Sequence, residues 1–139
     1  MTGVVLYASM SGNAEWLALE IARVRSIPSV HADLARVPDL ADAGRVLAVM
    51  PTWGRGELPL DAGPLARALA AAPGALAGVA FGLIALGDRR YPDFCGGGLA
   101  FARLLVAAGA SELAPPLLLD GAPVERHWGE VEHWLAHVW

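Results

Sequence analysis

The chain contains no lysine, a single cysteine and few aromatic residues. All ten basic residues are arginines, and 14 acidic residues outnumber them, which gives a formal net charge of −4. Nucleic acids and anionic membrane surfaces both call for a basic face, so neither is an expected partner. One cysteine, Cys95, excludes an internal disulfide and a zinc site built from several cysteines.

Charged residues make up only 17% of the 139 residues, whereas hydrophobic residues make up 55%. This balance excludes a disordered chain, and the length predicts one domain, residues 1–139, with a core of its own. The start, Met1–Val5, has no basic region before an apolar run and so does not predict a signal peptide. A reducing cytoplasm is therefore the expected compartment.

One uncharged stretch, residues 68–87, has the length of a membrane span. Pro73, Gly74 and Gly78 interrupt it, and most of its first half is alanine. These interruptions favour a helix, a turn and a buried strand over a membrane span.

Apolar runs of strand length alternate with stretches of helical period. The predicted strands are residues 4–7, 29–34, 45–50, 79–86 and 113–119. The predicted helices are residues 13–25, a short one within 36–44, 65–72, one from Phe94 or Leu99 to Ala108, and 128–138. Five strand–helix units predict an α/β fold with a doubly wound five-stranded parallel sheet, in the order 2-1-3-4-5, and helices on both faces.

Three loops with distinctive residues each follow a predicted strand. They are Ser9–Asn13, Pro51–Gly56 and Leu86–Tyr91. In doubly wound sheets, ligands sit beyond the carboxyl ends of the strands, at the point where the strand order reverses. The loops after the first and third strands flank that point, so the three loops are expected to share one site.

The first loop offers neutral hydrogen-bond donors for a phosphate. Gly12 permits a positive φ, while Ser9, Ser11 and Asn13 supply hydroxyl and amide donors. The helix that begins there adds backbone N–H groups and a partial positive charge. An N-cap with a tight turn would explain the same residues without a ligand. The Gly-Lys-Ser/Thr pattern of P-loop proteins and the Gly-x-Gly-x-x-Gly pattern of dinucleotide-binding proteins are both missing. A monophosphate therefore fits this loop better than the ligands of those two motifs.

The other two loops each present an aromatic ring. Trp53 precedes Gly54, and Tyr91 follows a polar run that begins at Asp88. Packing of Trp53 in a core, and an ordinary polar turn at Tyr91-Pro92, are the alternatives. One phosphate cradle with two aromatic walls nevertheless predicts a site for flavin mononucleotide (FMN), because a flat isoalloxazine ring stacks well on such side chains.

The three loops resemble those of the flavodoxin family, above all the short flavodoxins of the MioC kind and the FMN domains of sulfite reductase and cytochrome P450 reductase. Residues 6–15 resemble the phosphate loop of that family, and residues 52–59 and 86–95 resemble its two flavin loops. The resemblance implies a flavodoxin-like fold with non-covalent FMN as the cofactor. The residues implied around FMN are Ser9, Met10, Ser11, Gly12, Asn13, Ala14, Pro51, Thr52, Trp53, Gly54, Leu86, Gly87, Asp88, Tyr91 and Phe94.

The resemblance implies an electron carrier that shuttles single electrons between an NAD(P)H-dependent reductase and an acceptor enzyme, and a monomer is expected. No residue needs to act as an acid or base on a substrate, so catalysis in its own right is not expected. Two alternatives remain: a flavin-dependent quinone or nitro reductase, and a docking module that has lost FMN. Met10 and Arg55 depart from the family pattern, and Arg89 and Arg90 add positive charge to a rim that is commonly acidic.

Two further groups of residues have both a functional and a structural interpretation. His133 and His137 are four residues apart on a predicted helix, which would suit a metal pair, but an exposed helix face explains them as well and no metal site is predicted. Cys95 is either a reactive thiol near the flavin or a small buried residue at a helix start.

Overall fold

A computed structural model describes residues 3–139 of the chain. The strands are β1 (Val4–Tyr7), β2 (Ser29–His31), β3 (Arg45–Met50), β4 (Ala80–Gly87), β5 (Ser111–Glu112) and β6 (Leu117–Asp120). The helices are α1 (Asn13–Arg25), α2 (Val37–Ala43), α3 (Gly63–Ala70), α4 (Gly96–Ala107) and α5 (Trp128–Val138). Two short 3-10 helices are η1 (Leu60–Ala62) and η2 (Val124–His127).

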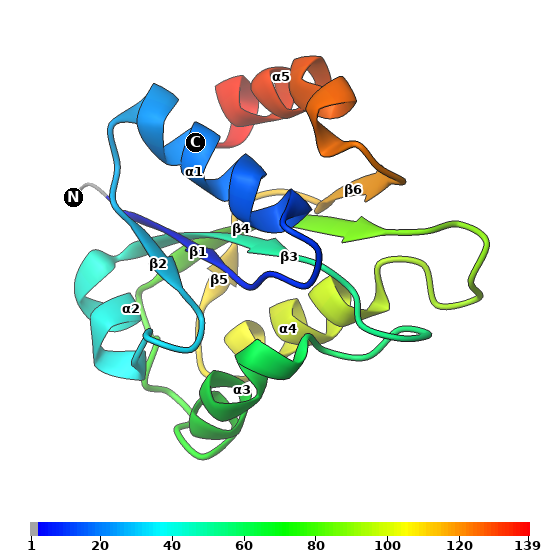
Figure 1. The fold of residues 1–139 in the computed structure, drawn as a ribbon. Helices are drawn as coiled ribbons and strands as arrows, with labels where there is room; N and C mark the ends of the chain where they lie inside the picture. Colours follow the sequence, from blue (N-terminus) through cyan, green and yellow to red (C-terminus); the bar gives the residue numbers. More distant parts are fainter. Residues whose placement is uncertain (1–2) are drawn as a thin grey trace.

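The strands form one parallel sheet in the order β2-β1-β3-β4-β5, and β6 also pairs with β4. The predicted α/β fold and strand order are confirmed. The sheet runs through the middle of the molecule, and the carboxyl ends of its strands lie on the right in Figure 1. The strand order reverses between β1 and β3, so the loops after these two strands meet at that edge.

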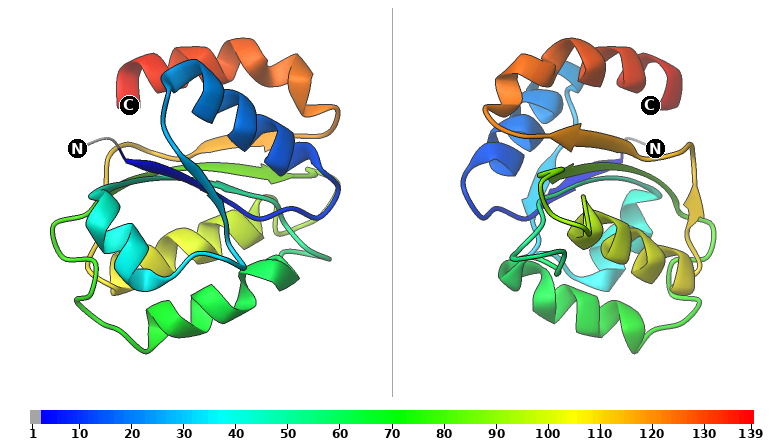
Figure 2. Two further views of the ribbon diagram at one scale, coloured as in Figure 1. Left: turned by 60° about the vertical axis from the view of Figure 1, so that its left-hand side comes forward. Right: turned by 90° about the vertical axis from the view of Figure 1, so that its right-hand side faces the viewer.

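Helices cover both faces of the sheet because both faces of its strands are apolar. In β3, Val46, Ala48 and Met50 pack into one core cluster, whereas Leu47 and Val49 pack into the other. The first cluster is completed by α2, α3 and α4, and the second by α1 and α5. Figure 2 shows these two helical layers on opposite sides of the sheet. Strands that are covered on both faces lack polar alternation, as the sequence of β4 indicates.

The fifth strand differs from its prediction. A single strand over 113–119 was expected, but β5 and β6 are separate, and both pair with β4. Pro115 and Pro116 lie between them, and proline has no backbone N–H to donate to a ladder. Within residues 3–139 the sheet therefore has six strands, where five were predicted.

Three other elements have boundaries that differ from the predicted ones. β2 ends at His31 instead of residue 34, because the N–H groups of Leu34 and Ala35 both donate to the His31 carbonyl in a turn. α3 occupies Gly63–Ala70, two residues before its predicted position. α4 begins at Gly96, between its two predicted starts.

Among residues 3–139, no helix is both long and apolar enough to cross a membrane. The uncharged stretch 68–87 contains the end of α3, a turn and all of β4, as its proline and glycines predict. The prediction that the chain does not start with a signal peptide involves Met1 and Thr2, which lie outside the described residues.

Candidate functional site

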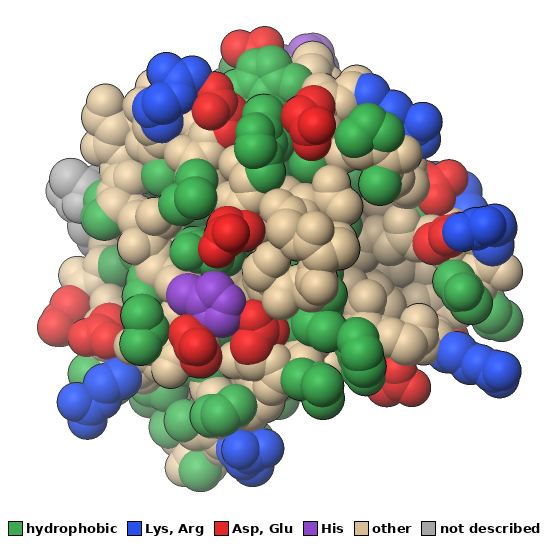
Figure 3. All heavy atoms as spheres, in the orientation of Figure 1, with side chains coloured by type: hydrophobic (Ala, Val, Ile, Leu, Met, Phe, Trp, Pro, Cys, Tyr) green, Lys and Arg blue, Asp and Glu red, His purple; other side chains and the backbone are tan. Residues whose placement is uncertain are grey.

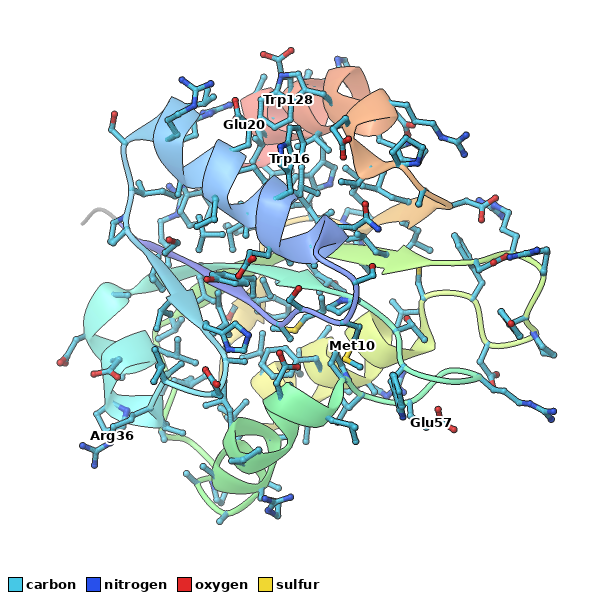
Figure 4. The ribbon with its side chains drawn as sticks, viewed as in Figure 1. Met10, Trp16, Glu20, Arg36, Glu57 and Trp128 are labelled. Carbon is cyan, nitrogen blue, oxygen red and sulfur yellow. The ribbon has the colours of Figure 1, made fainter. Side chains whose placement is uncertain are left out.

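A cleft of about 240 Å³ opens at the carboxyl edge of the sheet, where the loops after β1, β3, β4 and β6 converge. Ten of the predicted site residues line it: Met10, Ser11, Asn13, Pro51, Thr52, Gly54, Leu86, Gly87, Asp88 and Tyr91. Figure 4 shows Met10 on the loop between β1 and α1, and Glu57 on the loop after β3 at the same end of the sheet. The topology thus brings together three loops that are far apart in the sequence.

The loop between β1 and α1 presents a row of unused donors. Gly12 is the N-cap of α1 with φ 91°, and a Cβ at this position would meet no atom within 4 Å. Within residues 3–139, five backbone N–H groups of the loop and the first helical turn have no acceptor, those of Met10, Ser11, Asn13, Ala14 and Glu15. Backbone donors at a helix N-terminus suit an anion, and a phosphate monoester fits this neutral, open cradle.

The side chains of this loop form hydrogen bonds within the loop and to η2. Ser9 Oγ accepts a hydrogen bond from the Gly12 N–H at 3.2 Å, and Asn13 Nδ2 donates to Ser11 Oγ at 3.0 Å. Asn13 Oδ1 accepts the Val124 N–H at 3.3 Å, which ties the loop to η2. The backbone donors are therefore held in place before any ligand binds.

The loop after β3 is a tight hairpin that carries Trp53. The N–H of Trp53 donates to the Glu57 carbonyl and the N–H of Glu57 donates to the Trp53 carbonyl, both at 2.9 Å. Gly54 has φ 56°, which other residues resist. The Thr52 hydroxyl donates to the Leu86 carbonyl at 3.0 Å and accepts the Gly97 N–H at 3.3 Å. Thr52 thus fixes the hairpin against β4 and α4.

The loop after β4 carries charges that are paired within the chain. The Arg90 guanidinium donates to both carboxylate oxygens of Asp88, and the Arg90 N–H donates to Asp88 Oδ1 at 2.9 Å. These hydrogen bonds, those from the guanidinium first, lower the pKa of the Asp88 carboxyl to about 2. The Arg89 N–H donates to Asp120 Oδ1 at 2.9 Å, and the Arg89 guanidinium lies 4.4 Å from the centre of the Phe94 ring. Figure 3 shows arginine and acidic side chains interleaved along this edge of the molecule.

Cys95 lies beneath the cleft as the N-cap of α4. Its side chain is buried, and Sγ donates to the Ala85 carbonyl at 3.4 Å. Burial raises the pKa of the Cys95 thiol to about 11, so the thiol is protonated at neutral pH. This environment favours the structural interpretation of Cys95 over the reactive one.

The histidine pair lies away from the cleft, on α5. The rings of His133 and His137 are 4.6 Å apart, and His137 Nδ1 is 2.8 Å from the His133 carbonyl. No group of three or more His, Cys, Asp or Glu residues in the described part of the chain is arranged to hold a metal ion.

Five predicted site residues do not line the cleft: Ser9, Gly12, Ala14, Trp53 and Phe94. Ala14 is buried in the core, although its N–H faces the loop, and the Phe94 ring lies under Arg89. The Trp53 side chain is 44% exposed beside the cleft. The roles assigned to all of the site residues stay predictions.

The cleft also has lining residues that were not among the predicted site residues: Arg55, Asp93, Cys95, Gly121 and Ala122. The last two belong to the turn after β6. The pair Asp120-Gly121 is a turn signal at the end of a strand, and it could have indicated a fourth loop at the same edge.

The fold and the cleft together define a doubly wound α/β protein with a site for a mononucleotide at its switch point. The chain belongs to the flavodoxin family, whose sequence model matches residues 5–134. It is 31% identical over 134 residues to the MioC homolog of Pasteurella multocida, covering 94% of this chain and 91% of the relative. It is 35% identical over 126 residues to the sulfite reductase [NADPH] flavoprotein alpha-component of a Shewanella species, covering 86% of this chain and 21% of that protein.

The solved structure of a mutant flavodoxin from Pseudomonas aeruginosa is similar throughout, with a TM-score of 0.80, 29% identity and 99% of each chain covered. Family membership makes FMN the cofactor of this protein and electron transfer its role. The residues present fit that cofactor, since the loop around Gly12 has N–H groups without an acceptor among residues 3–139, Gly12 borders open space, and two exposed aromatic side chains flank the cleft.

Proposed function

We propose that this protein accepts single electrons from an NAD(P)H-dependent reductase and passes them to an acceptor enzyme. The observation that supports this most is the openness of the cleft at its aromatic rim, where Trp53 and Tyr91 are 44% and 47% exposed. A redox group held at such a rim has an edge at the protein surface, which a partner protein can approach directly. This arrangement favours a carrier over an enzyme with an enclosed substrate pocket.

FMN supplies the one-electron chemistry when it is bound. The backbone donors of the loop after β1 would hold its phosphate, and Thr52 would keep the hairpin of Trp53 in place beside the ring. The groups around the ring are poorly suited to acid–base chemistry at neutral pH. Asp88 is held ionised by Arg90, and the buried Cys95 stays protonated.

An NADPH-linked donor is supported by the likeness to one part of a larger reductase. The chain matches 21% of the length of the sulfite reductase flavoprotein alpha-component, so a unit of this kind occurs within that protein. The name of that relative includes NADPH, and from this likeness we infer an NAD(P)H-dependent reductase as the electron donor for this chain. A monomer in the cytoplasm completes the proposal.

The test is the reduction of cytochrome c as an artificial acceptor. With NADPH and a purified flavoprotein reductase, addition of the FMN-loaded protein should raise the rate in proportion to its concentration. Without the reductase, NADPH and this protein alone should reduce neither cytochrome c nor a quinone. Direct turnover of a quinone with NADPH alone would instead support a flavin-dependent quinone reductase.

A further inference from the structure

A partly buried polar network lies next to the phosphate loop and connects it to two other segments. Asp61 of η1 accepts the Ser9 N–H at 2.9 Å through Oδ2. The same oxygen lies 2.9 Å from Nε2 of His31, the last residue of β2. One carboxylate thus joins the end of β1, the end of β2 and η1.

The Ser9 N–H differs from the N–H groups that follow it in the loop, because it already has an acceptor. The next N–H groups along the loop, those of Met10 and Ser11, have no acceptor within residues 3–139, whereas the Ser9 N–H is already used by Asp61. Asp61 therefore fixes the first peptide of the loop and leaves the following ones free for an anion. A donor row anchored in this way loses less conformational entropy when the anion binds.

The Asp61 charge is costly at this position unless something offsets it. Its second oxygen, Oδ1, is buried and has no hydrogen-bond partner among the described residues. An ionised carboxylate that is partly withdrawn from water also repels a phosphate placed one residue away. Groups that contact the Asp61 carboxylate elsewhere than at the loop must therefore compensate its charge.

His31 is the group that faces the Asp61 carboxylate from that side. Its Nδ1 lies 2.5 Å from Asp33 Oδ1, and its ring meets the edge of the Tyr7 ring with 5.1 Å between centroids. A ring held between two carboxylates and an aromatic neighbour has a fixed orientation. Its Nε2 donor is therefore directed at Asp61.

We propose that Asp61 and His31 are positioning residues for the phosphate of FMN. Asp61 orients the phosphate loop through the Ser9 N–H, and His31 Nε2, which lies within hydrogen-bond distance of the same carboxylate oxygen, offsets by hydrogen bonding part of the negative charge that Asp61 places beside the phosphate. This inference rests on the loop after β1 as the phosphate site of the FMN cleft. It adds to that site two residues that do not line the cleft.

The test compares FMN with riboflavin, which lacks the phosphate, by fluorescence titration of the apoprotein. Asp61→Ala removes the acceptor of the Ser9 N–H, so FMN should bind about tenfold more weakly while riboflavin binding stays within about twofold. Asp61→Asn keeps an oxygen acceptor and should restore FMN affinity to within about threefold of the wild type. Asp42→Asn, which removes an exposed carboxylate from α2, is the matched control and should change neither affinity.

His31→Leu removes the donor at similar volume and leaves Asp61 uncompensated. FMN should then bind about fivefold more weakly, with riboflavin unaffected. In the double variant His31→Leu/Asp61→Asn this loss should largely disappear, because the charge that His31 offsets is gone. Such non-additivity is a signature that a general loss of stability does not produce.

Equal weakening of FMN and riboflavin in Asp61→Ala would overturn the proposal, and so would an unchanged preference for FMN. An additive double variant would overturn the part assigned to His31. A wild-type protein that binds FMN no better than riboflavin would contradict the phosphate site itself, and the proposal with it. A wild-type protein that prefers FMN, with variants that keep the same preference, would contradict this proposal alone.

Discussion

Gly97 is the residue whose substitution should most directly separate the hairpin of Trp53 from the sheet. It is buried in the first turn of α4, and its N–H donates to Thr52 Oγ1. A Cβ at Gly97 would lie 2.5 Å from the Glu57 carbonyl oxygen and 2.9 Å from the Pro51 carbonyl oxygen. Both contacts are with backbone, so neither can be relieved by rotating a side chain, and α4 or the hairpin must move.

Gly97→Ala should therefore destabilise the protein, although alanine is the better helix former by about 1 kcal/mol. Overpacking costs about 1–3 kcal/mol, and contacts this short with backbone atoms belong in the upper part of that range, at about 2–3 kcal/mol. After the helix gain is subtracted, we expect a net loss of about 1–2 kcal/mol in urea unfolding of the apoprotein. FMN affinity should also fall, because the displaced hairpin carries Trp53.

The matched control is Gly129→Ala in α5, where a Cβ would meet no atom within 4 Å. This change should leave FMN affinity unaltered and raise stability by up to about 1 kcal/mol. The reasoning is refuted if Gly97→Ala unfolds at the same urea concentration as the wild type, or at a higher one.

Three other predictions concern the groups that surround the cleft. Arg55 lines the cleft, and its guanidinium has no hydrogen-bond or ion-pair partner among residues 3–139. Arg55→Asp should therefore lower the potential for the second electron by roughly 20–60 mV in a redox titration, because it changes the charge at the cleft by two units while the reduced flavin is anionic. Arg25→Asp, at the far end of α1, is its control, and equal potentials for Arg55→Asp and the wild type would contradict the idea. With its thiol pKa raised to about 11, Cys95 should react slowly with iodoacetamide at pH 8 in the folded protein, and the rate should rise as the pH approaches 11; rapid labelling at pH 8 would show a different environment. The Asp88 carboxyl should titrate near pH 2 by NMR and return toward its ordinary range in Arg90→Gln. Because its folded-state pKa is lowered, the small stabilisation from this exposed pair is present above about pH 4 and fades as the pH falls toward 2.

The fold was largely predictable because its strands are continuous apolar runs that end at prolines, glycines and polar turn residues. β1, β3 and α1 have the predicted bounds, since Pro51 ends β3 and Gly12 begins α1. The two consecutive prolines, Pro115 and Pro116, are the feature of the sequence that goes with the division of the fifth strand. Two prolines can either bend a strand or divide it. Which of the two happens depends on the hydrogen bonds that the neighbouring strand β4 can form on each side of the prolines, and the sequence alone does not give the register of that pairing.

The site was predictable as a set of loops and less so as a set of contacts. Local sequence chemistry accounts for the positive φ at Gly12 and for the N–H groups after it that have no acceptor in the described part of the chain. The contact between Asp61 and Ser9 joins residues 52 positions apart, and neither residue type predicts the other. The pairing of Arg89 with Asp120 was equally hidden, because it depends on where β6 ends beside β4.

Figure 4 shows a further long-range contact of this kind, with Trp16 and Trp128 pointing toward one another from α1 and α5. Their rings are 6.3 Å apart and nearly perpendicular. This edge-to-face contact packs α1 against α5 on one face of the sheet.

The most direct test of the account is titration of the apoprotein with FMN while flavin fluorescence is followed. A flavodoxin with the site described here should quench one equivalent of FMN with a sharp end point, and the bound flavin should show a shifted visible absorption spectrum. No quenching and no spectral change at stoichiometric protein would contradict the cofactor site, and the protein would then be a module in which the fold persists without its flavin.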